Sequence, residues 1–169
     1  MPDPAILTIV ADNGFSFETA CIPAGINWSK SALFNEVAII ARSSPIITYS
    51  SSSAIVLPIN LEFYAMFGKA QEEVADIQKS FMSLTFPVTP GIQPPPMCRI
   101  TYGGVFKQWK AGCMSASPYS GKHNIWDSSG LPLTGGISLQ FKGIEIDNVA
   151  SDEWLASTSF DQLGWGGIT

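Results

Sequence analysis

The 169-residue sequence is apolar and poor in charge: 46% of its residues are hydrophobic, 14% are charged, and the net charge at pH 7 is -5. This length favours a single domain with a substantial buried core. The nine lysines and arginines are scattered, which argues against a dedicated nucleic-acid-binding protein. No apolar run reaches the roughly 18 residues that a membrane-spanning helix needs, and we expect no secretion signal at the N-terminus. A surface with so few charges favours a protein that covers part of itself with partners.

Several segments rich in β-branched and aromatic residues open the chain and predict strands. They are residues 5–10, 37–40, 45–50 and 54–67. In the last segment Ile59, Leu61 and Phe63 alternate with more polar residues, so one face of that strand is expected to be buried. Pro58 predicts a bend or a sheet edge within it, because proline cannot donate a ladder hydrogen bond. The serines from 50 to 53 predict a loop or a polar strand.

One segment, residues 69–84, has clear helical periodicity. Its apolar residues recur at spacings of four and three, at Ala70, Val74, Ile77, Phe81 and Leu84. Glu72 and Glu73 fall in the first turn, where the helix dipole favours carboxylates. Phe86 precedes Pro87, which forces the backbone out of the helical region. The pattern therefore predicts one amphipathic helix of about four turns.

Three further strands are predicted after the helix, at residues 97–104, 105–120 and 136–146. The run Pro94 to Pro96 is expected to carry the chain, stiff and extended, from the helix back to the sheet. The apolar alternation of the last strand changes phase at Gly143, which predicts a β-bulge there, and Gly103 with Gly104 is expected to turn a similar corner.

The order of strands, one helix and more strands predicts a mainly β fold. Because strands and helices do not alternate, a parallel sheet is disfavoured, and we predict an antiparallel β-barrel or sandwich with one flanking amphipathic helix. We predict one domain over residues 1–169, with a core at about 37–147 and extended N- and C-terminal arms. The tail, residues 159–169, is interpreted as an arm that buries Trp165 against another surface.

The residue pattern does not indicate catalysis, a cofactor or a metal site, and we predict that the protein is not an enzyme. His123 and Asp127 are interpreted as polar loop residues, and the sequence lacks the G-x-S-x-G elbow of a serine hydrolase. Glu62 and Glu145 are the carboxyl pair that a hydrolase would use, although solvated acids on strands are common.

The three cysteines are Cys21, Cys98 and Cys113, without C-x-x-C spacing. We predict buried thiols; a Cys98–Cys113 bridge across a hairpin, or a bridge between subunits, is the alternative.

Five tryptophans are spread along the chain and could stack against sugars or hold subunits together. Of these, the candidates for subunit interfaces or for packing are Trp109, Trp154 and Trp165.

Four features between Leu57 and Ile146 form a recognisable series. They are the strand residues Glu62 and Phe63, the helix residues Val74 and Asp76, the prolines 94–96 followed by Gly103 or Gly104, and Gly130 with Pro132. This series resembles the tail-tube-like proteins that initiate or join the inner tube at the baseplate of contractile phage tails and related injection systems. The serine-rich N-terminal third lies outside the resemblance.

The resemblance implies a β-barrel or sandwich that assembles into a homohexameric ring of a phage tail or baseplate. It implies a tube initiator or hub-tube connector of the virion, assembled in the host cytoplasm, with the major tail tube protein as the alternative within this class. Its implied partners are other copies of itself and neighbouring tube, hub, spike or baseplate wedge proteins. DNA would only pass through the lumen, which is expected to be acidic, and no membrane or cofactor is implied.

A second class of function stays open on the residues alone, a carbohydrate- or small-ligand-binding β-barrel that uses exposed tryptophans.

Overall fold

Eight strands and one α-helix make up the part of the chain that the computed structural model describes, namely residues 7–20, 25–40, 43–64, 70–89, 93–120, 130 and 133–144. Before the helix lie β1 (Leu7–Ala11), β2 (Ser16–Thr19), β3 (Ala32–Val37), β4 (Ile46–Ser52) and β5 (Val56–Tyr64). The helix α1 (Ala70–Met82) continues into a 3-10 turn, η1 (Ser83–Thr85). After it come β6 (Met97–Tyr102), β7 (Phe106–Ser120) and β8 (Thr134–Gly143).

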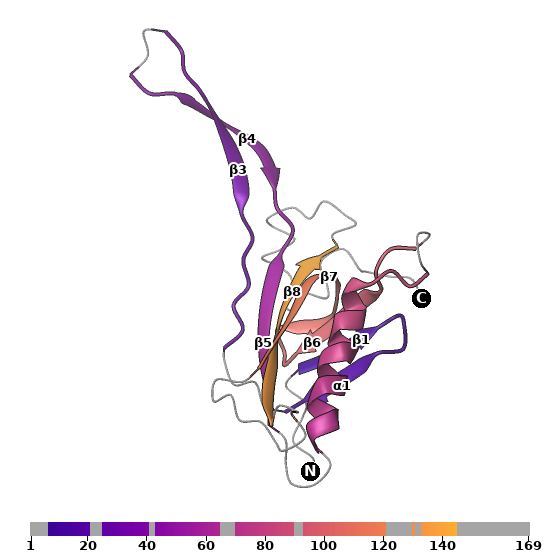
Figure 1. Ribbon diagram of the computed structural model, residues 1–169. Helices are drawn as coiled ribbons and strands as arrows, with labels where there is room; N and C mark the ends of the chain where they lie inside the picture. Colours follow the sequence, from indigo (N-terminus) through magenta and orange to yellow (C-terminus); the bar gives the residue numbers. More distant parts are fainter. Residues whose placement is uncertain are drawn as a thin grey trace.

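Six of these strands form one antiparallel sheet in the order β2-β1-β6-β7-β8-β5. The sheet curls into a half-barrel with α1 packed beside it (Figure 1), so the predicted mainly β fold with one helix is confirmed. β5 stands at one edge of the sheet, as Pro58 predicted. Because β1 and β2 belong to the sheet and Leu7 and Ile9 are fully buried, the core begins well before the predicted residue 37.

The buried faces of the strands follow the alternation in the sequence. In β5, Leu57, Ile59 and Leu61 are buried, while Pro58 and Asn60 between them are exposed. One face of this strand therefore packs on the core and the other meets water. The largest fully buried side chains in the described residues come from the sheet, α1 and η1: Phe81, Phe106, Phe141, Leu7, Ile9, Leu57, Ile59, Leu84, Ile100 and Ile137.

Helix α1 is held to the sheet by the stripe that its periodicity predicted. Val74 and Phe81 of the helix and Leu84 of η1 are buried, and Ile77 packs against the core. The ring of Phe81 meets those of Phe15 and Phe17 edge-on, with centroids 4.9 Å away in both cases. The predicted amphipathic helix is thus confirmed. No helix among the described residues is long and apolar enough to cross a membrane.

The predicted bulge at Gly143 is wrong. The β7–β8 register runs without a shift from Phe141 to Gly143, where β8 ends, and it shifts between Cys113 and Ser115 on β7 instead. Gly143 serves a packing purpose, because a Cβ there would lie 2.7 Å from the ring of Trp109. Gly103, with a φ of 51°, lies in the turn between β6 and β7, where glycine is favoured sterically.

One strand lies earlier in the chain than predicted. The apolar run at residues 37–40 was expected to be a strand, but β3 spans Ala32–Val37 and residues 38–40 follow it outside the strand. The difference arises because β3 pairs with β4 in a fixed register, with Ala32 opposite Ser52 and Val37 opposite Ile46. A strand is defined by its partner, and residues 38–40 lie beyond the last pair.

Gly136 of β8 gives a direct test of the sheet packing. A Cβ at this position would lie 2.6 Å from the carbonyl oxygen of Leu61 and would collide with the ring of Tyr119. We expect Gly136→Ala to lower the free energy of unfolding by about 2 kcal/mol, because a backbone atom cannot move aside cheaply. Gly104→Ala is the control, since no atom lies within 4 Å of its Cβ, and it should change stability by less than about 0.5 kcal/mol. Equal urea unfolding midpoints for the two variants would contradict this packing.

Candidate functional site: a projecting hairpin

The strands β3 and β4 form a separate two-stranded sheet that leaves the body of the protein. They pair only with each other among the described residues, and Figure 1 shows them extending well beyond the half-barrel. We call residues 32–52 the projecting hairpin. A two-stranded ribbon of this kind has no core of its own and is marginally stable in water without cover.

Every residue of β3 and β4 is exposed. Of the 14 large hydrophobic side chains that are exposed among the described residues, 8 belong to this hairpin: Leu33, Phe34, Val37, Ile39, Ile40, Ile46, Ile47 and Tyr49. Ile40, beyond the end of β3, is 98% exposed. Such a concentration of apolar surface is typical of a site that another molecule covers.

The register of the hairpin sorts these side chains onto two faces, because residues directly opposite each other share a face and successive residues alternate. Phe34 stands opposite Tyr49, and Ile47 stands opposite Glu36, two residues along β3. We call this the aromatic face; the rings of Phe34 and Tyr49 meet edge-on with centroids 5.8 Å apart.

The second face carries aliphatic side chains. Val37 stands opposite Ile46 on it. The register shifts between Leu33 and Phe34, where the extra residue is Ser50 of β4, so β3 itself keeps its alternation and places Leu33 on the same side as Val37. We call this the aliphatic face. All three of these side chains are exposed, as are the three apolar side chains of the aromatic face. The hairpin is therefore apolar on both sides.

Hydrogen bonds between serines connect the two sides of the hairpin at its base. The backbone N–H of Ser53 donates to the carbonyl oxygen of Ser31 (2.7 Å), and the N–H of Ser31 donates to Oγ of Ser53 (2.9 Å). One step nearer the body, Ser29 and Val56 exchange two backbone hydrogen bonds of 3.0 and 2.9 Å. The hairpin thus continues the line of β5, and the serine run forms part of a polar strand, one of the two forms predicted for it.

The exposed face of the six-stranded sheet is basic at its centre. Arg99 of β6 lies opposite Lys110 of β7, and Lys142 of β8 lies opposite Gly112, two residues further along β7. Arg99 is paired with Asp12 at 3.8 Å.

Of the three tryptophans singled out in the sequence, Trp109 lies in the described residues. It is only 5% exposed and packs against Phe106, with ring centroids 5.1 Å apart. Of its two predicted roles, subunit interface or packing, Trp109 therefore has the packing role, inside the body of the protein. Trp154 and Trp165 lie outside the described residues, as does the predicted C-terminal arm. Trp28 is the more exposed of the two described tryptophans and meets Phe106 edge-on.

The cysteines of the sheet are free thiols, so the alternative of a Cys98–Cys113 bridge is wrong. The register places Ala111 opposite Cys98, two residues short of Cys113. Burial raises the pKa of Cys98 to about 12 and that of Cys113 to about 11. Both thiols therefore stay protonated near neutral pH and are poor nucleophiles. Cys21 lies outside the described residues.

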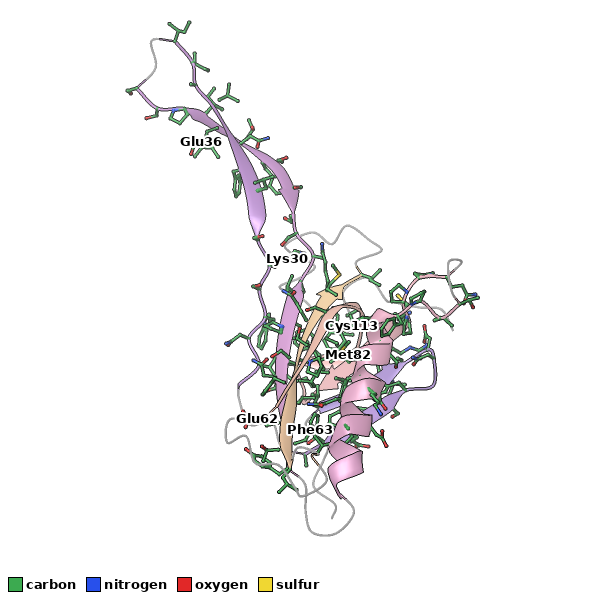
Figure 2. All side chains as sticks on the ribbon, viewed as in Figure 1. Lys30, Glu36, Glu62, Phe63, Met82 and Cys113 are labelled. Carbon is green, nitrogen blue, oxygen red and sulfur yellow. The ribbon has the colours of Figure 1, made fainter. Side chains whose placement is uncertain are left out.

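Of the acids singled out in the sequence as a hydrolase pair, Glu62 lies in the described residues. Glu62 accepts a hydrogen bond from the hydroxyl of Tyr64 (3.0 Å), which raises the pKa of that tyrosine. Figure 2 shows Glu62 on the body, far from Glu36 on the hairpin. Its proposed partner Glu145, and the pair His123 and Asp127, lie outside the described residues. Within the described ranges no three His, Cys, Asp or Glu residues gather as a metal site would require.

The hairpin is the feature that the sequence reading missed. Residues 32–52 were interpreted as ordinary strands and turns, since a strand of a projecting ribbon has the same β-branched and aromatic composition as a strand of a core. The one available signal was the lack of alternation: the apolar residues of β3 and β4 fall on both faces, unlike those of β5.

Comparisons of the chain with protein families and with curated proteins find no match.

The thiols give a test of the body of the protein. At pH 8 we expect iodoacetamide to alkylate Cys98 and Cys113 at least about a hundredfold more slowly in the folded protein than in concentrated urea, because both buried pKa values lie well above that of an exposed thiol. Peptide mass spectrometry after timed quenching measures each cysteine separately. Equal rates in the folded and unfolded protein would show that these strands do not bury the thiols.

Proposed function

We propose that this protein is a structural subunit that assembles with its own copies into a ring, as a tail-tube-like component of a contractile phage tail or baseplate. The observation that carries the proposal is the projecting hairpin, which holds eight exposed large hydrophobic side chains away from the half-barrel. An isolated subunit would leave this surface in water at a considerable cost in free energy. Association with other subunits removes that cost.

The architecture of the body supports the same proposal. In the described residues β2 and β5 are the edge strands of the curled antiparallel sheet, and strands of neighbouring copies can continue it along β2 and along β5 beyond the Ser29–Val56 pair. The hairpin and the body are different surfaces, so a contact between them is heterologous, and heterologous contacts close into rings when the rotation between subunits allows. The role of each subunit is then geometric: it docks on its neighbours and offers the template for the next layer.

Within this class we propose a tube initiator or hub-tube connector. This finer assignment rests on the resemblance over residues 57–146, which the antiparallel half-barrel and the flanking helix support. The proposed partners are further copies of the chain together with tube, hub, spike or wedge proteins, and the proposed location is the virion.

A sugar-binding barrel is the second candidate. Trp28, exposed at the side of the body, is the described residue that favours it. Titration of tryptophan fluorescence with a panel of oligosaccharides tests it, and a saturable change in emission that is absent in Trp28→Ala would favour this candidate.

Removal of the hairpin tests the proposed self-assembly. Because Ser31 and Ser53 are hydrogen-bonded to each other, residues 32–52 can be replaced by a two-residue Asn-Gly turn without stretching the chain. We expect the full chain to form oligomers at micromolar concentration and the shortened chain to be a folded monomer, as measured by analytical ultracentrifugation and negative-stain microscopy.

Far-UV circular dichroism and a cooperative thermal transition provide the control that the shortened chain retains the half-barrel. Rings formed equally well by both chains would contradict the role of the hairpin. A full chain that stays monomeric up to high micromolar concentration would contradict the proposed function itself.

A further inference from the structure

We infer that each projecting hairpin is inserted between two other copies of this chain, one covering its aromatic face and one covering its aliphatic face. The inference rests on the proposed self-assembly and adds to it the number of partners that each hairpin contacts. Its basis is that Phe34, Ile47 and Tyr49 lie on one side of the ribbon, and Leu33, Val37 and Ile46 on the other.

The chain itself shows what a strand with only one covered face looks like. In β5 the residues that face the core are Leu57, Ile59 and Leu61, and those that face water include Pro58 and Asn60. A ribbon that lay flat on one partner would follow the same rule, apolar on the covered side and polar on the other. The hairpin does not follow it.

The exposure of the two faces is also similar. On the aromatic face, Ile47 is the most exposed of the three apolar side chains at 62%, and on the aliphatic face Leu33 is the most exposed at 58%. Neither face is turned toward the body, since the hairpin extends away from it and its side chains point into open space on both sides (Figure 2). A single partner surface would leave one of these two faces in water.

The covered area is sufficient for a stable contact. Burying the six apolar side chains of the two faces, together with Ile39 and Ile40 beyond the end of β3, would remove on the order of 800 Å² of the hairpin from water, which is what one partner contributes to a standard-size protein interface. Divided over two faces, each contact is smaller than a standard interface, and the two together reach the area that one partner contributes to it.

The chemistry of the hairpin favours protein as the partner. Glu36 and Arg42 are the two charged residues in the sequence of the hairpin, which contains no lysine, no tryptophan and no cluster of basic residues. A segment that binds anionic lipid headgroups or nucleic acid uses basic side chains, and aromatic anchors at a membrane surface are typically tryptophans. In an assembly of identical copies, every subunit offers the same receiving surfaces, so each hairpin can find two of them.

The test compares one variant for each face in the full chain. The aromatic-face variant is Phe34→Thr with Ile47→Thr, and the aliphatic-face variant is Leu33→Thr with Val37→Thr; threonine keeps the preference for a strand. The matched control is Asn35→Thr, which replaces one polar residue by another on the aliphatic face. We expect both double variants to raise the concentration at half-assembly at least tenfold in sedimentation velocity, and the control to leave it within about twofold.

Hydroxyl-radical footprinting of the unmodified chain gives a second reading that does not depend on the folding of a variant. On assembly, side chains of both faces should lose reactivity, with Tyr49 reporting the aromatic face and Leu33 the aliphatic face. Unchanged circular dichroism of the variants at low concentration shows that their monomers are folded, as expected because the substituted side chains are exposed and lie outside the core cluster of the body.

The outcomes separate the inference from the function on which it rests. If the unmodified chain assembles but only one face is sensitive to substitution and footprinting, the hairpin lies on a single surface and the inference fails while the proposed self-assembly stands. If the unmodified chain never assembles, both fail. One further result would overturn the inference. It is that the chain floats with anionic lipid vesicles only when the hairpin is present, while the face variants leave assembly unchanged.

Discussion

Phe81 of α1 packs against the rings of Phe15 and Phe17 at 4.9 Å and stacks on Phe63 at 6.2 Å, and this contact gives the curled sheet its covered side. These rings come from the helix, from the end of the β1–β2 connection (Phe15), from β2 (Phe17) and from β5 (Phe63), so one aromatic cluster joins parts of the chain that are far apart in sequence. A single helix suffices because the sheet curves around it. On the other face of the sheet, outer residues of β5 and β8 such as Asn60, Gln140 and Lys142 are polar and exposed among the described residues.

The requirement that a second layer of side chains covers an apolar strand face also explains why the projecting hairpin is unusual. A side chain on a strand gains free energy only when a second layer covers it, and the body supplies that layer to the six-stranded sheet alone. The hairpin carries as apolar a pattern as a core strand, but among the described residues no second layer covers either of its faces. The proposed cover is other copies of the chain, and the hydrogen bonds of Ser31 and Ser53 hold the base of the hairpin.

Much of the body could be predicted from the sequence because its signals are local. The helix at 69–84 followed from the spacing of Val74, Ile77 and Phe81, and the sheet edge at β5 from Pro58, which lacks the N–H that an inner strand needs. The glycines were harder to interpret. Gly143 was expected to bend a strand, but it leaves room for the ring of Trp109, a contact between β8 and β7 that the spacing along β8 does not encode.

Local periodicity thus determined the helix and the inward-facing side of a strand such as β5, since burial along one segment follows the spacing of its own apolar residues. Tertiary structure alone decided that β3 and β4 pair with each other outside the sheet, because pairing depends on which strand edges meet in space. It also decided that Trp109 is buried and that Leu33, Phe34 and Ile47 are not. A hydrophobic residue in a strand stabilises the fold only when other side chains bury it, and only the arrangement of the whole chain shows whether the protein itself provides those side chains.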